Sequence, residues 1–151
     1  MLEQAIAAAA GFLIAVLWFD LMFDVQVARH RREPTVPEPV LGSIAAYYRR
    51  VTTTASPMGR LVGLVMLVLL GGLVAQAVDG DVPAWVSAVS IPAAVLATGL
   101  AIARVFAAAR RLGARTDSVE EQSRLARAIF RAHLVCLAGM SVVLAVQLAG
   151  A

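Results

Sequence analysis

The sequence predicts an all-α, polytopic membrane protein: a four-helix transmembrane bundle, up-down-up-down, with one amphipathic interfacial helix. Hydrophobic residues make up 60% of the 151 residues and charged residues only 15%, whereas soluble domains average about 45–50% and about 25%. Four apolar segments also reach about the 20 residues that a helix needs to cross hydrocarbon. We therefore expect a single integral membrane domain over residues 1–151.

Four transmembrane helices are expected, at about residues 5–27, 58–77, 84–108 and 129–149. Each is an unbroken apolar run without the alternation of a strand, and in lipid such a run satisfies its backbone hydrogen bonds as a helix. In the short turn between the second and third spans, Asp81 is the expected N-cap. Ser118 and Glu121 match a capping box, so the last helix should begin near Ser118, before it enters the membrane.

The distribution of arginine predicts the orientation. All thirteen basic residues are arginine, and they fall in the connection after the first span, in the connection over about residues 109–128, and at the helix ends beside them. By the positive-inside rule both connections are cytoplasmic and both termini lie outside the cytoplasm. Because this pattern accounts for the net charge of +3, and no nucleic-acid motif accompanies it, we expect no nucleic-acid partner.

The first connection contains a predicted amphipathic helix over about residues 38–53, because its apolar residues recur at helical spacing. Within it, Tyr47, Tyr48, Arg49 and Arg50 combine amphipathic rings with cations, a composition that suits the lipid headgroup layer. Two roles remain open for this helix. It either covers the end of the bundle or recognises anionic lipid.

Two acids interrupt the first span. Asp20 and Asp24 are one helical turn apart, so they share a face about 40° wide. A carboxylate in the membrane costs about 2.5–3.5 kcal/mol at the bilayer centre and therefore needs a partner. At the same predicted depth lie Arg104, Arg131 and His133, and we expect these five residues to form a polar layer that either fixes helix register or handles a proton or ion.

A metal site is a weaker hypothesis. His133, Cys136 and Met140 share one face of the last span, and imidazole, thiolate and thioether together would suit copper(I). Cysteine and methionine are, however, common apolar fillers. The only other histidine is His30, which lies beyond the membrane end and is poorly placed to pair with His133 on a haem. The sequence therefore names no cofactor.

Three functions remain open. The first is a small accessory or scaffold protein of the membrane, favoured because no catalytic motif is present. The second is a small proton- or cation-coupled transporter that uses Asp20 and Asp24. The third is a membrane redox enzyme with a metal or haem near His133. The expected partners are the lipid bilayer and either a second copy of the chain or a larger membrane complex; whether the protein is an enzyme stays open.

Overall fold

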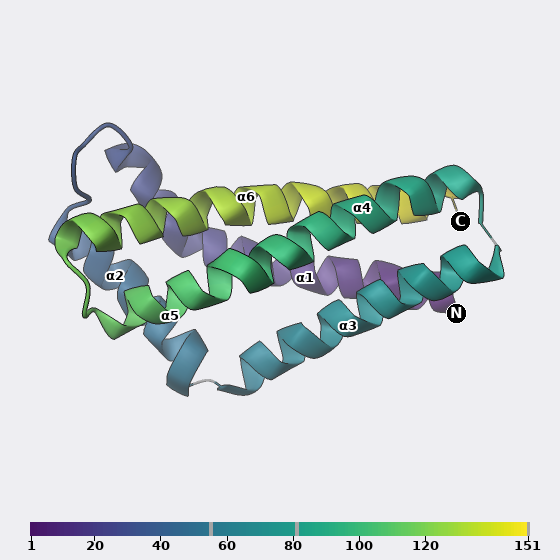
Figure 1. The fold of residues 1–151 in the computed structure, drawn as a ribbon, viewed down its shortest axis with the longest axis horizontal. Helices are drawn as coiled ribbons and strands as arrows, with labels where there is room; N and C mark the ends of the chain where they lie inside the picture. Colours follow the sequence, from purple (N-terminus) through teal and green to yellow (C-terminus); the bar gives the residue numbers. More distant parts are fainter. Residues whose placement is uncertain (55, 81, 151) are drawn as a thin grey trace.

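The structure is a computed structural model that describes residues 1–54, 56–80 and 82–150, and these residues form helices without any strand (Figure 1). Four helices are long and apolar enough to cross a membrane, which is consistent with the integral, multi-pass protein that the sequence predicts. Their bounds are Leu2–His30, Pro57–Asp79, Ala84–Ala114 and Val119–Gly150.

The first and third of these helices change pitch along their length. Helix α1 (Leu2–Asp24) continues into the 3₁₀ segment Val25–His30. Helix α4 (Ala84–Leu100) continues through the π-helical turn Ala101–Val105 into α5 (Phe106–Ala114). This third helix is longer than the span expected to end near residue 108. It ends where the backbone of Arg115 turns left-handed, with φ of 58°.

The other helices are α2 (Glu38–Arg49), followed by the π-helical turn Arg50–Thr54, then α3 (Ser56–Asp79) and α6 (Val119–Gly150). At the start of α6, the backbone N–H of Glu121 donates to Ser118 Oγ at 3.3 Å, as the capping box predicts. The cap expected at Asp81 lies outside the described residues.

The four long helices form a ring in which α1 and α4 each pack against both α3 and α6. Both termini lie at one end, and α2 and α5 lie at the other, where α3 leans away from its neighbours (Figure 1). The approach of α4 to α6 is close because a Cβ on Gly139 would lie only 3.2 Å from the carbonyl oxygen of Ala93. The core of the ring is aliphatic and includes Ile6, Leu13, Leu69, Leu73, Met140 and Val143.

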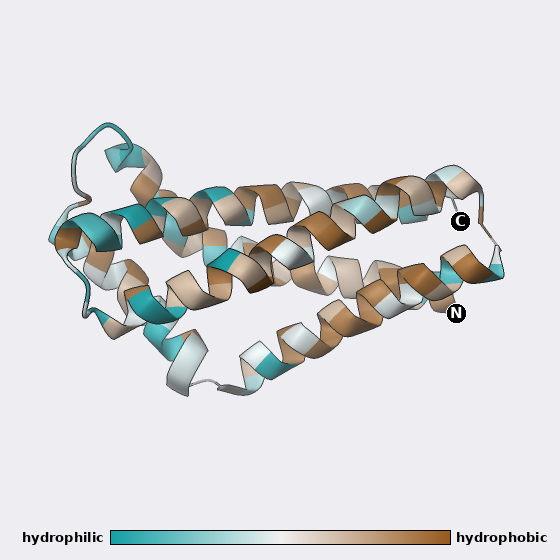
Figure 2. Ribbon diagram, viewed as in Figure 1, coloured by the Kyte–Doolittle hydropathy of each residue, from teal (hydrophilic) through white to brown (hydrophobic). Residues whose placement is uncertain are grey.

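Helix α2 lies across the polar end of the bundle (Figure 2). Its residues Leu41, Ile44 and Tyr48 are buried in a second core with Leu112 of α5 and Ile129 of α6. The backbones of α2 and α5 come into contact, since a Cβ on Gly113 would lie 2.8 Å from the backbone nitrogen of Arg49. This helix is therefore held by protein contacts along its apolar face.

The connection before α2 is attached to α6. The Arg127 guanidinium donates to the carbonyl oxygens of His30 at 3.1 Å and Glu33 at 2.7 Å. The backbone N–H of Val36 donates to Ser123 Oγ at 2.9 Å. These bonds fix the start of α2 relative to α6, and so they position the side chains that α2 turns inward.

Candidate functional site

The two acids of α1 face the interior of the bundle and meet His133 of α6. The Nδ1 atom of His133 lies 2.7 Å from Asp24 Oδ2, and Nε2 lies 3.7 Å from Asp20 Oδ2. The Asp24 side chain is 0% exposed and that of His133 is 4% exposed, while Asp20 keeps 16%. One imidazole therefore lies between two carboxylates, one sealed and one partly accessible.

Helix α2 supplies a phenol to each acid. Tyr48 donates its hydroxyl to Asp24 Oδ1 at 2.7 Å, and Tyr47 donates to Asp20 Oδ1 at 2.6 Å. The Tyr47 ring also stacks on Phe23, with ring centroids 4.1 Å apart and planes inclined by 10°. We call Asp20, Asp24, Tyr47, Tyr48 and His133 the carboxylate cluster. It joins α1, α2 and α6.

Tyr47 and Tyr48 point toward the acids of α1, whereas the sequence predicts that this segment lies in the lipid headgroup layer. Of the four residues predicted for the headgroup layer, Arg49 and Arg50 are exposed, whereas Tyr48 is 2% exposed and Tyr47 is half-buried. Burial first, and then the neighbouring carboxylates, raises the pKa of both phenols well above the usual value. Both therefore remain protonated and act as hydrogen-bond donors to the acids.

The predicted arginine partners do not join the acids. Arg104 and Arg131 are exposed and line a separate cleft between the π-helical turn and α6. Arg131 precedes His133 by two residues, which places the two side chains about 200° apart around the helix at about 100° per residue. Since His133 faces inward, Arg131 must face outward. Among the described residues, the ion pairs of the two aspartates are with His133 alone.

The cluster contains two carboxyl groups and a single imidazole. One imidazole therefore serves both acids, and the two acids differ in how their oxygens are hydrogen-bonded. Asp24 is satisfied at both oxygens, by Tyr48 and by His133. Asp20, by contrast, accepts from Tyr47 through Oδ1, and its Oδ2 is too far from His133 for a hydrogen bond. Asp20 is therefore the acid with capacity for a further proton or cation.

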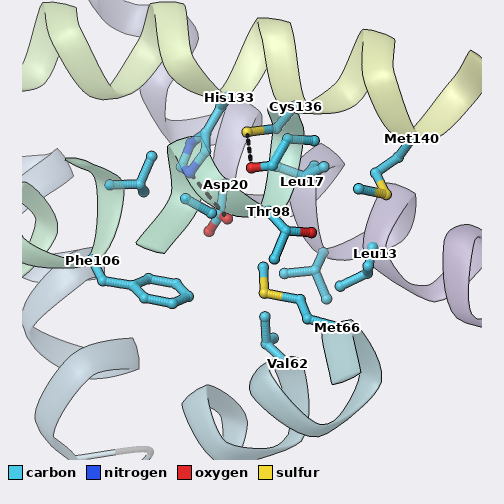
Figure 3. A pocket seen from close by; sticks show the side chains of 14 residues that line it. Leu13, Leu17, Asp20, Val62, Met66, Thr98, Phe106, His133, Cys136 and Met140 are labelled. Carbon is cyan, nitrogen blue, oxygen red and sulfur yellow. Dashed lines mark hydrogen bonds and ion pairs between the residues drawn. The ribbon is translucent and has the colours of Figure 1, made fainter. Parts of the chain in front are cut away.

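A cavity of about 50 Å³ lies beside Asp20, between α1, α3, α4 and α6 (Figure 3). Its polar lining includes Asp20, His133 and Thr98, and the rest is mainly aliphatic and aromatic, with Leu17, Met66 and Phe106 among the lining residues. The Thr98 hydroxyl is buried and has no hydrogen-bond partner within the described part of the chain. Because a water needs about 10–15 Å³, the cavity has room for a few water molecules next to Asp20.

The side chains proposed for copper also line this cavity, but they have other contacts. The Cys136 thiol donates to the carbonyl oxygen of Ala97 at 3.3 Å, and Met140 packs in the aliphatic core. Both nitrogens of His133 face carboxylates. In residues 1–54, 56–80 and 82–150, no three His, Cys, Asp or Glu side chains are arranged to hold a metal ion. His30 instead bonds Glu33 at 2.9 Å.

A second buried polar group lies toward the end of the bundle that carries the termini. Gln76 of α3 and Gln147 of α6 exchange amide hydrogen bonds of 3.1 and 2.9 Å. Gln147 also donates to Ser90 of α4 at 3.3 Å. These three residues, here called the amide layer, are at most 3% exposed. Their signal in the sequence was the presence of two glutamines inside apolar spans.

Comparisons with known proteins do not identify a family for this chain. No protein-family model matches it, and neither a curated protein nor a solved structure is significantly similar. The chemistry of the two buried polar groups is therefore the basis for assigning a function.

Proposed function

We propose that this protein is a small proton- or cation-coupled transporter whose binding site is the carboxylate cluster. The observation that carries the proposal is the asymmetry of the two acids around one imidazole. Asp24 is sealed and fully hydrogen-bonded, whereas Asp20 lines the cavity and has an oxygen that accepts no hydrogen bond in the described structure. Ionisable groups within membrane spans are expected at proton and ion pathways.

The geometry supports a proton relay through His133. A proton arriving from the cavity binds Asp20, which faces Nε2 of the imidazole at 3.7 Å. A closer approach or a bridging water would allow transfer to Nε2, while Nδ1 shares its proton with Asp24 at 2.7 Å. Net transport then requires the proton to leave Asp20 toward the membrane side opposite to its entry. Each step moves one proton between named atoms and leaves the charge of Asp24 compensated.

The proposal includes an arrangement in the membrane. The four spans alternate in direction as an up-down-up-down bundle, and the positive-inside rule puts the end with α2 and α5 in the cytoplasm and both termini outside. Helix α2 then lies at the cytoplasmic interface and covers the carboxylate cluster. The concentration of arginines at that end supports this orientation.

A transporter of this size needs more than one copy. The cavity of about 50 Å³ holds only a few waters and does not run the length of the bundle. We therefore expect a homo-oligomer, in which a path past Asp20 is completed between copies. The part of α3 that leans away from its neighbours is the part most suited to such a contact (Figure 1).

The second candidate is an accessory or scaffold protein, favoured by the completeness of the bonds around Asp24. Its two oxygens connect α2 and α6 to α1. A network of this kind can fix helix register without handling a proton. In that case Asp20 and His133 would matter for folding and for binding to a larger membrane complex, and not for flux.

Proton flux in liposomes separates the two candidates. The purified protein is reconstituted with a trapped pH-sensitive dye, and a potassium diffusion potential set with valinomycin drives proton entry. We expect wild-type protein to acidify the lumen faster than protein-free liposomes. Asp20→Asn should abolish this difference, because it removes the titratable group beside the cavity.

The matched control is Asp79→Asn, which removes an exposed carboxylate at the end of α3. It should keep the wild-type rate, and circular dichroism should show both variants folded. Wild-type protein that conducts no faster than empty liposomes, with and without added sodium or potassium gradients, would overturn the transport proposal. If Asp20→Asn then lowers the stability of a protein that conducts no protons, the accessory role is favoured.

A further inference from the structure

A cleft of about 510 Å³ lies between α6 and the helix formed by α4, the π-helical turn and α5. Four arginines line it: Arg104, Arg111, Arg124 and Arg131. Its remaining lining is apolar and includes Leu100, Val105, Ile129 and Val135. The cleft shares only Val105 with the lining of the cavity beside Asp20, and it is separate from the carboxylate cluster.

The four arginines divide into two pairs. Arg111 bonds Asp117 at 2.9 Å and Glu121 at 3.0 Å, and Arg124 bonds Glu121 at 2.7 and 2.6 Å. The charges of these two arginines are therefore compensated by acidic side chains. Arg104 and Arg131 have no such acidic partner within the described residues. The cleft therefore contains two cations without counter-charges above an apolar floor.

The depth of these two arginines matches the level of lipid phosphates. Arg131 lies roughly 28 Å along α6 from Gly150, and Arg104 lies roughly 30 Å from Ala84, at about 1.5 Å per residue. The hydrocarbon core is about 30 Å thick. If the far ends of these helices reach the opposite boundary, both guanidinium groups lie where headgroups meet acyl chains. An uncompensated arginine at this level attracts anionic lipid.

We propose that this cleft binds one anionic phospholipid, with its phosphate on Arg104 and Arg131 and an acyl chain along the apolar floor. The planar guanidinium donates two parallel hydrogen bonds to a phosphate, which makes arginine well suited to this contact. The apolar floor favours a lipid over a free phosphate ion, which has no acyl chain to pack against Leu100 and the exposed Val135.

The test is a titration of detergent-solubilised protein with palmitoyl-oleoyl phosphatidylglycerol, followed by native mass spectrometry. The wild-type protein should retain one molecule of this lipid. It should retain much less phosphatidylcholine with the same acyl chains. The double variant Arg104→Gln/Arg131→Gln should bind about 30-fold more weakly, which corresponds to about 1 kcal/mol for each arginine. Unchanged affinity in this variant would overturn the proposal.

The control variant is Arg31→Gln/Arg32→Gln, which removes the same charge from exposed positions outside the cleft. It should bind the lipid within about twofold of wild type; an equal loss in both double variants would indicate general surface attraction and overturn the cleft site. Inorganic phosphate serves as the second probe. If millimolar phosphate displaces the lipid completely and binds with the same arginine dependence, the site is one for free anions and the lipid assignment is wrong.

Discussion

The carboxylate cluster and the amide layer are both buried, and each joins three helices, but they satisfy their polar atoms in different ways. Gln76 and Gln147 exchange two bonds with each other, so the pair is neutral and nearly complete by itself. In the cluster, one imidazole serves two acids, and Asp20 Oδ2 lies 3.7 Å from it, beyond hydrogen-bond distance. The comparison teaches that burial alone does not mark a functional site. What distinguishes the candidate site is an ionisable side chain, Asp20, with an oxygen that accepts no hydrogen bond in the described structure.

The largest expected difference between the two regions follows from removing His133. His133→Leu leaves the buried Asp24 without its imidazole partner, and breaking a buried ion pair from one side costs about 3–5 kcal/mol. We expect a loss of this size in the free energy of unfolding, measured by SDS titration followed with circular dichroism. A loss of under 1 kcal/mol would show that Asp24 is neutral in the folded protein.

The tyrosines should show a smaller effect that differs between neighbours. Tyr48→Phe removes the hydroxyl bonded to the sealed Asp24, and a hydrogen bond to a charged group contributes about 1.5–3 kcal/mol. Tyr47→Phe should cost less, about 1 kcal/mol, because Asp20 keeps contact with the cavity and can be hydrated. The same unfolding assay measures both. Equal losses would contradict the asymmetry on which the transport proposal depends.

The amide layer should lose less than the cluster, and the loss should be recoverable. Gln147→Leu leaves the Gln76 amide unsatisfied in the core, at a cost of about 1–2 kcal/mol. The double variant Gln76→Leu/Gln147→Leu removes both partners and should restore most of that loss. Unfolding of the two variants is compared directly. A double variant as unstable as the sum of both single variants would mean that shape, and not hydrogen bonding, holds this layer.

The smallest effect is expected at Arg131, which was predicted from the sequence to lie at the same depth as the two aspartates. Arg131→Gln should change the free energy of unfolding by less than about 0.5 kcal/mol in detergent without anionic lipid, because the side chain is exposed and bonds neither aspartate. A destabilisation close to that of His133→Leu would return Arg131 to the polar layer and would contradict the outward placement.

The sequence was sufficient to predict what depends on composition along one helix. Apolar runs of span length predict transmembrane helices, and two acids one turn apart predict a shared buried face. The same helical geometry, applied to positions 131 and 133, would have excluded Arg131 as a partner once His133 was chosen. Two buried glutamines were also visible as polar residues inside apolar spans, although their mutual contact depends on the ring order of the helices.

The tyrosine contacts could not be predicted from local pattern. Tyr47 and Tyr48 belong to a short helix whose apolar face would suit a lipid surface or a protein surface equally well. The choice is made by distant residues, such as Gly113, which allows α5 to touch α2, and Arg127, which holds the preceding connection. Contacts between distant helices leave no recognisable pattern in the sequence of a single helix.

The pairing of Asp24 with His133 also constrains how the protein is made. The two residues are 109 positions apart, so the first span leaves the ribosome long before its partner exists. During that interval its acids either bind protons or stay near the headgroups, because an ionised carboxylate in lipid is costly. The first span therefore reaches its final contacts, with Asp24 against His133, only when the last span arrives. A chain truncated before residue 133 should present an incompletely inserted first helix to the quality-control proteases of the membrane.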